Sequence, residues 1–197
     1  MARMVLQLLL IGYFLIYIFE TKTSAVILLT LGVMLIAAGW ISLRTIEAKR
    51  KTLFLKAIIS ISVGGGITLI LITQVVIGLD PWYQPSYMIP LAGMIFANAM
   101  TAISLAAERL SSELTGNVNY TQASTKAYEA ALIPVINGLL AVGLVSLPGM
   151  MTGQILTGVS PLIAARYQIM VMAMIFGASG LSVLLFLKLV KTNFERS

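Results

Sequence analysis

The segment GLVSLPGMMTGQILTGVSP, residues 143–161, is apolar enough to lie in a membrane, yet it is rich in residues that interrupt helices. It carries Pro148 and Pro161 together with Gly149, Gly153 and Gly158. Proline removes a backbone donor and clashes with the preceding helical turn, so a helix should bend or end at Pro148. We therefore expect a helix to about Leu147, a short half-helix over residues 150–156, and a turn from Gly158 to Pro161.

The composition of the whole chain places this segment in a membrane protein. Of 197 residues, 59% are hydrophobic and only 10% are charged, and the mean hydropathy is +0.98. Soluble domains are typically about 25% charged. The composition predicts one integral membrane domain over residues 1–197 and leaves no room for a separate catalytic domain.

The predicted fold class is all-α, a polytopic bundle of about six transmembrane helices with a broken helix near Pro148. A bilayer core of about 30 Å needs about 20 helical residues. Six apolar stretches meet or approach that length: 4–19, 24–43, 53–79, 87–107, 131–147 and 167–190. The alternation of apolar and polar residues that is typical of membrane β-barrels is absent.

The basic residues predict the orientation of the chain. With a cytoplasmic N-terminus, eleven of the thirteen lie on the inner side: Arg3, Arg44, Lys49, Arg50, Lys51, Lys56, Arg109, Lys126, Lys188, Lys191 and Arg196. Only Lys22 and Arg166 then lie outside. Because cytoplasmic loops carry the excess of Lys and Arg, we expect a multi-pass protein of the plasma (inner) membrane with both termini in the cytoplasm. The same clustering between apolar runs argues against nucleic-acid binding.

Several kinds of chemistry are disfavoured by the residues present. The chain has no histidine and no cysteine, and none of its seven acidic residues falls inside an apolar stretch. Proton-driven transporters usually need an ionisable group inside the membrane. No GxxxxGK[ST] loop is present to hold a nucleotide. We expect no enzymatic activity, no cofactor and no energy source within the chain, and the sequence identifies no metal ligands.

Uncharged polar residues and methionines at membrane depth allow two interpretations each. Asn98, Asn137 and Gln154 either form hydrogen bonds between helices or line a polar path. The chain's methionines either fill gaps in the packing or form a relay for a soft metal. The break itself is either a packing kink or a gate, since broken helices mark substrate sites in many transporters. The gate interpretation involves Asn98, Asn137, Pro148, Gly149, Met150, Met151, Gly153 and Gln154.

Two stretches of the sequence carry a family resemblance. Residues 81–110 contain IPLAGM followed by Asn98, and residues 130–175 contain GLVSLPGMMTGQIL and then RYQIM. These motifs resemble the FetB family of ABC transporter permeases, which is linked to iron export and to aluminium tolerance in plants. The resemblance extends from about Arg3 to the C-terminus. It implies a partner ATP-binding subunit, a homodimer of permeases, and export of a metal ion (iron) or another small solute.

Two features depart from the family pattern. Family members usually begin with an additional N-terminal span, so we expect this chain to be truncated or a short variant. Their cytoplasmic loop after IPLAGM normally contains a Leu-Gly-Ala-x-Pro stretch, whereas residues 111–130 read SSELTGNVNYTQASTKAYEA. The resemblance implies that the 108–130 loop contacts the ATPase and transmits its movement, through Glu108, Arg109, Lys126 and Glu129. A membrane scaffold subunit and a passive ion channel remain the alternatives.

Overall fold

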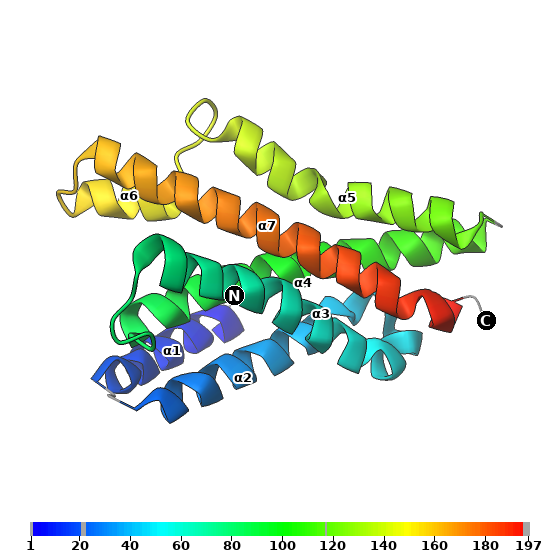
Figure 1. Ribbon diagram of the computed structural model, residues 1–197, viewed down its shortest axis with the longest axis horizontal. Helices are drawn as coiled ribbons and strands as arrows, with labels where there is room; N and C mark the ends of the chain where they lie inside the picture. Colours follow the sequence, from blue (N-terminus) through cyan, green and yellow to red (C-terminus); the bar gives the residue numbers. More distant parts are fainter. Residues whose placement is uncertain (1, 21–22, 117, 195–197) are drawn as a thin grey trace.

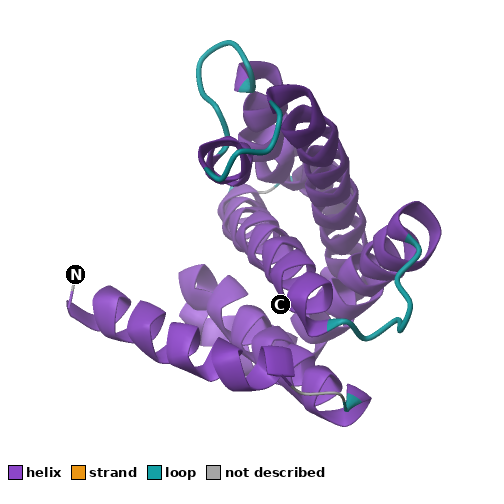
Figure 2. Cartoon of the chain, turned by 90° about the vertical axis from the view of Figure 1, so that its left-hand side faces the viewer, coloured by secondary structure: helices purple, strands orange, loops and turns teal. Residues whose placement is uncertain are grey.

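The computed structural model describes residues 2–20, 23–116 and 118–194. Within these ranges the chain consists of helices and loops without a strand, as Figure 2 shows, and the predicted all-α fold class is confirmed. The helices, in chain order, are α1 (Ala2–Glu20), α2 (Ser24–Ser42), η1 (Arg44–Lys49), α3 (Arg50–Ile70), η2 (Leu71–Ile77), α4 (Pro85–Thr115), α5 (Tyr120–Ala141), α6 (Gly149–Leu156) and α7 (Pro161–Phe194).

Four helical segments of the described chain are long and apolar enough to cross a membrane: Ser24–Ser42, Arg44–Ile77, Pro85–Thr115 and Pro161–Phe194. They contain the second, third, fourth and sixth predicted stretches almost entirely. The third segment ends in the π-helical turns of η2, and Gly78 closes it in the left-handed region at φ +71°. A shorter apolar helix over Met4–Glu20 corresponds to the first predicted stretch.

The fifth predicted stretch, 131–147, is not one helix. α5 ends at Ala141, six residues before the expected end. Gly143 adopts φ +78°, a conformation that glycine enters without steric cost, and the amides of Leu144 and Val145 both donate to the Ala141 carbonyl. A tight turn therefore ends this helix before Pro148 is reached, and the prediction of a continuous helix to Leu147 was wrong.

The centre of the bundle is formed by α3, α4 and α7, with α2 and α5 packed against α4 (Figure 1). Small residues allow the close approach of these helices. Ala99, Ala102 and Ala106 of α4 are fully buried, and Ala123 and Ala127 of α5 are too. Because lipid supplies no hydrophobic drive between helices, such small-residue contacts are a general way for them to associate.

The helix α1 lies at the side of the bundle (Figure 2), and most of its side chains are exposed. Leu8, Leu9 and Leu10 are each more than 60% exposed, whereas Ile18 is buried. A helix this apolar needs either lipid or another protein around it.

The two ends of the bundle differ in their residues. α6 and the connection between η2 and α4 lie at one end, which we call the α6 end (Figure 1). The end of α7, the α4–α5 turn and η1 lie at the other, which we call the basic end. There Lys56 donates to the Leu189 carbonyl at 2.6 Å, and Lys49 lies 4.0 Å from the centre of the Phe194 ring.

The basic residues assigned to the inner side thus include several that meet at one end of the bundle. Arg50 also belongs there, and donates to the Trp40 carbonyl at 2.7 Å. Arg166 lies near the start of α7, beside Val76 and Ile77 of η2. Lys22 and Arg196 lie outside the described residues, as does the side chain of Arg3.

Candidate translocation site

The break in the opening segment is an independent short helix, α6. Pro148 precedes it with φ −61° and ψ 144°, an extended conformation that proline favours, and occupies the N-cap position. Its carbonyl accepts the first helical bond from the Thr152 amide at 2.9 Å. Pro148 therefore starts a helix. The helix before it, expected to bend or end at Pro148, ends at Ala141 instead.

The glycine at the end of α6 stops the helix by a Schellman motif. The amide of Val159 donates to the Gln154 carbonyl at 3.0 Å, and the amide of Gly158 donates to the Ile155 carbonyl at 3.0 Å. Gly158 adopts φ +92°, which the motif requires. Pro161 then begins α7, where its missing amide costs no hydrogen bond. The predicted half-helix and the turn to Pro161 are both confirmed.

The length of α6 decides how it can lie in a membrane. Eight residues rise about 12 Å, less than half of the roughly 30 Å hydrocarbon core. Figure 1 shows α6 lying against the first turns of α7. The segment between α5 and α7 is therefore too short to cross as a helix. Its irregular residues 143–147 are exposed, with Leu144 at 87% and Val145 at 83%. At membrane depth such backbone needs protein or water around it.

A cavity of about 480 Å³ lies between α6, the first turns of α4 and the start of α7. We call it the methionine cavity, because one methionine comes from each of these helices: Met94, Met150 and Met170. Tyr87 and Tyr167 also line it, as does Gln154, one turn after Met150 on the same face of α6. The Gln154 Oε1 atom is buried and accepts no hydrogen bond.

A second cavity, of about 410 Å³, lies on the other side of α6, against α5 and α7. Met151 and Met172 line this side cavity together with Gln168. The Gln168 side chain is only 6% exposed, and its Oε1 atom has no hydrogen-bond partner. Burial of an amide oxygen without a hydrogen bond costs free energy. Gln168 is therefore an unsatisfied polar group in an otherwise mostly apolar lining.

The two asparagines of the predicted path lie apart from each other. Asn98 is half-buried on α4, one turn beyond Met94, and its Nδ2 donates to the Met94 carbonyl at 2.8 Å. It therefore continues the cavity-lining face of α4. Asn137 is exposed on α5 and is not among the residues lining either cavity.

The glycine pair of α6 makes no close contact. A Cβ atom built on Gly149 or on Gly153 would meet nothing within 4 Å. The structure thus joins Met150 and Gln154 to one cavity and Met151 to the other, while Pro148, Gly149 and Gly153 shape α6 without lining either.

The predicted coupling loop, 108–130, is mostly helical. α4 continues to Thr115 and α5 begins at Tyr120, where the Asn119 side chain accepts from the Gln122 amide at 2.8 Å and caps the helix. The prediction of a long polar loop was wrong, because its charged residues pair along and across the two helices.

The acid at the centre of that pairing is Glu113. The sequence analysis selected Glu108 and Glu129 instead. Glu113 lies 2.6 Å from Arg109, one turn away on α4, and 2.8 Å from Lys126 on α5. Its carboxylate is shared by two of the four residues predicted to face a partner. The other two, Glu108 and Glu129, are exposed. The signal in the sequence was the spacing of four between Arg109 and Glu113.

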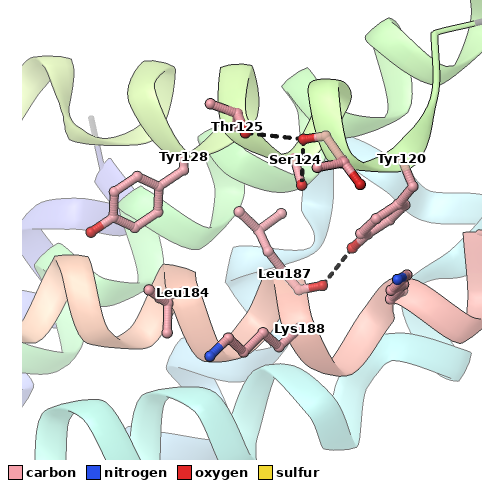
Figure 3. Close-up of a pocket in the computed structure, with 9 residues that line it drawn as sticks. Tyr120, Ser124, Thr125, Tyr128, Leu184, Leu187 and Lys188 are labelled. Atoms are coloured by element: carbon pink, nitrogen blue, oxygen red, sulfur yellow. Dashed lines mark hydrogen bonds between the residues drawn. The ribbon is translucent and has the colours of Figure 1, made fainter.

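A third cavity, of about 330 Å³, opens between α5 and α7 at the basic end. Figure 3 shows the side chains that line it: Tyr120, Ser124, Thr125 and Tyr128 of α5, and Leu184, Leu187 and Lys188 of α7. Tyr120 donates its hydroxyl hydrogen to the Leu187 carbonyl and so ties the start of α5 to α7. The basic end therefore has a groove between α5 and α7, in addition to the ion pairs that join α4 and α5.

The donors in the methionine cavity are neutral side chains. Among the described residues, no three acidic, histidine or cysteine side chains come together to hold a metal ion. The sequence analysis treated the methionines as one group and did not single out Met94 or Met170. It missed Tyr167 and Gln168, because sequence alone does not tell whether a polar residue near the start of a helix lines a cavity or faces water.

Comparisons with known proteins agree with this architecture. The family model described as "Uncharacterised protein family (UPF0014)" matches residues 1–124 and 118–194. The UPF0014 membrane protein slr1647 of Synechocystis is 38% identical over 92% of this chain and 76% of its own length. The "Probable iron export permease protein FetB" of Escherichia coli is 33% identical over 100% of this chain and 80% of its own.

A plant relative matches as well. "Protein ALUMINUM SENSITIVE 3" of Arabidopsis thaliana is 34% identical over 92% of this chain and 70% of its own length. No solved structure matches the chain significantly. The family model covers the broken segment and the bundle on both sides of it, so this multi-pass helical membrane protein belongs to the UPF0014 family.

Proposed function

We propose that the chain is the membrane-spanning permease subunit of an ABC transporter, which exports a metal ion or another small solute. ATP is hydrolysed on a separate subunit in this proposal. The observation that carries it is the 33% identity to the iron export permease of E. coli over the whole of this chain. The plant relative whose name refers to aluminium supports a metal as cargo.

The α6 end supports a role in translocation. Half-helices in transporters commonly border the substrate site, where irregular backbone is covered by protein or by a water-filled cavity. Here α6 separates two cavities and is joined to its neighbours by turns that contain Gly143 and Gly158 in left-handed conformations. A rotation about these turns would change both cavities together, as a gate requires.

The basic end is the proposed site of contact with the ATPase. Positive residues gather there, and by the positive-inside rule this supports a cytoplasmic position for this end and for both termini. Glu108 and Glu129 are exposed on the same two helices as the Glu113 pairing, and the groove of Figure 3 lies between α5 and α7. The rigid α4–α5 hairpin, in place of a flexible loop, would transmit the movement of the ATPase to α4.

A second copy of the chain is the proposed partner within the membrane. Asn137 is exposed on α5 among Ile133, Ile136 and Leu140, each at least 40% exposed. An amide facing hydrocarbon needs a hydrogen-bond partner. A contact between two permeases along α5 would supply it and would enclose a path between them.

Pull-down of the full chain from native membranes tests this function. We expect an ATP-binding subunit to accompany the chain, and ATP-dependent movement of solute in vesicles that contain both. Ion flux without ATP would identify a passive channel instead. Association with other membrane proteins, without an ATPase and without flux, would identify a scaffold.

A further inference from the structure

The methionine cavity is lined by three methionines from three different helices. Met94 lies on α4, Met150 on α6 and Met170 on α7, and all three line the same space of about 480 Å³. Methionines that only fill the core look different here, because Met88 and Met174 are 6% and 1% exposed. Met150, by contrast, is 37% exposed beside the cavity. Met150 is therefore only partly covered by the protein.

The oxygen ligand in the same cavity has no protein partner. Gln154 follows Met150 by one helical turn, and its buried Oε1 atom accepts no hydrogen bond. A buried carbonyl oxygen without a partner is costly, and a cation is one group that would satisfy it. Tyr87 and Tyr167, whose phenol groups are neutral oxygen ligands, also line this cavity.

The nature of these donors selects the class of cation. Hard ions such as Mg²⁺ and Ca²⁺ prefer carboxylates, and Zn²⁺ or Fe²⁺ prefer imidazole, thiolate and carboxylate ligands. The lining of the cavity contains none of these groups. Thioethers are soft ligands that favour Cu(I) and, by the same softness, Ag(I). A monovalent ion also needs less negative charge around it than a divalent ion does.

We propose that the methionine cavity is a binding site for a soft monovalent metal ion of the Cu(I) type. The thioethers of Met94, Met150 and Met170 are its ligands, and Gln154 Oε1 is an additional oxygen ligand. The claim that this ion is the cargo of a transporter rests on the proposed function. The claim that the isolated chain binds the ion does not depend on that function, because no ATPase residue lines the cavity.

Titration of the purified full-length chain with Ag(I) tests this site, since Ag(I) binds thioethers and is not oxidised by air. We expect one saturable site per chain, measured by calorimetry and by metal analysis after dialysis. Labelled methionine methyl groups should report the site by NMR, with shifts for Met94, Met150 and Met170 among the eleven methionines. A large excess of Fe(II) or Zn(II) should not displace the silver.

A matched pair of variants separates the site from general binding to sulfur. The triple variant Met94→Leu, Met150→Leu, Met170→Leu conserves volume and should bind Ag(I) at least tenfold more weakly. The control Met34→Leu, Met100→Leu, Met174→Leu removes three methionines outside the cavity and should bind within twofold of the parent. If the triple variant does not fold, Met150→Leu alone, at an exposed position, should weaken binding at least threefold.

Three results would overturn the proposal: no saturable Ag(I) site in the parent, equal losses in the cavity and control variants, or displacement of Ag(I) by stoichiometric Fe(II). Failure of this site and failure of the proposed function are distinguishable. An ATPase that accompanies a chain unable to bind Ag(I) would leave a permease with another cargo. Tight Ag(I) binding without any ATPase would leave a metal site in a protein of another function.

Discussion

Gly64 of α3 and Ser182 of α7 are in backbone contact at the centre of the bundle. A Cβ atom added to Gly64 would lie 2.6 Å from the Ser182 amide nitrogen and 2.9 Å from its Cα atom. Backbone atoms cannot move aside as the end of a flexible side chain can. The distance between α3 and α7 is therefore set by the absence of a side chain at position 64.

Gly64→Ala should destabilise the protein by about 1–3 kcal/mol, because overpacking would force α3 and α7 apart. Gly66→Ala is the matched control, two residues away on the same helix, where an added Cβ meets nothing within 4 Å. It should leave stability unchanged or raise it by up to about 1 kcal/mol, because alanine favours helix over glycine. Thermal unfolding of both variants in the same detergent measures the difference. Equal midpoints would refute the close contact.

The turn after α6 should be sensitive to substitution at Gly158. Gly158→Ala places a Cβ in a left-handed conformation, which costs an L-residue about 1–2 kcal/mol. We expect lower stability and reduced solute movement per folded molecule. Gly153→Ala, in the open interior of α6, should preserve both. Matching effects at the two positions would show that the turn is not a hinge.

Replacement of Pro148 should change the helix boundaries less than it would if Pro148 kinked a continuous helix. Pro148 caps α6, and the turn at Gly143 already separates α6 from α5. Pro148→Ala with Gly149→Ala should therefore leave α5 and α6 separate and the protein folded. Electron spin resonance distances between labels on α5 and α6 measure this. A label separation typical of one continuous helix would contradict the structure.

Reversal of one ion pair tests the α4–α5 hairpin. Glu113→Lys places like charges beside Arg109 and Lys126, and we expect weaker binding of the ATPase subunit. Adding Lys126→Glu restores the cross-helix pair in the opposite sense and should recover much of the binding. Co-purification of the ATPase provides the measurement. Absence of recovery in the double variant would mean that Glu113 acts through another contact.

Single cysteines test the orientation without interference, because the parent chain has none. A cysteine at Ser86, at the α6 end, should react with an impermeant reagent added outside the cell. A cysteine at Thr121, at the basic end, should react only after the membrane is opened. The reverse pattern would place the N-terminus outside.

Much of the fold could be predicted from the sequence, because long apolar runs admit few structures in lipid. Residues 24–43 and 167–190 are helical almost throughout, and α6 occupies the positions expected from its proline and glycines. The end of α5 could not be placed, since Gly143 alone gives a weak signal inside an apolar run. The helical state of residues 120–130 was hidden by their polarity, which is typical of both loops and exposed helices.

The candidate site was predicted only in part. Met150 and Gln154 were selected for the break beside them, and the structure places both on one cavity. Their partners Met94, Tyr167 and Met170 come from helices distant in sequence, and helix packing alone determines which faces meet. Asn137 is exposed on α5 and lines neither cavity of the single chain, so its predicted place on a path stays a prediction.

Isolation of the full chain from native membranes under mild conditions tests the central claim, that this UPF0014 protein is a permease driven by a separate ATPase. The account predicts that an ATP-binding subunit is recovered in equal molar amount, and that this recovery is lost when Glu113→Lys disrupts the α4–α5 hairpin. A chain recovered repeatedly without an ATP-binding subunit, under conditions that keep it folded and in its native assembly, would contradict the claim.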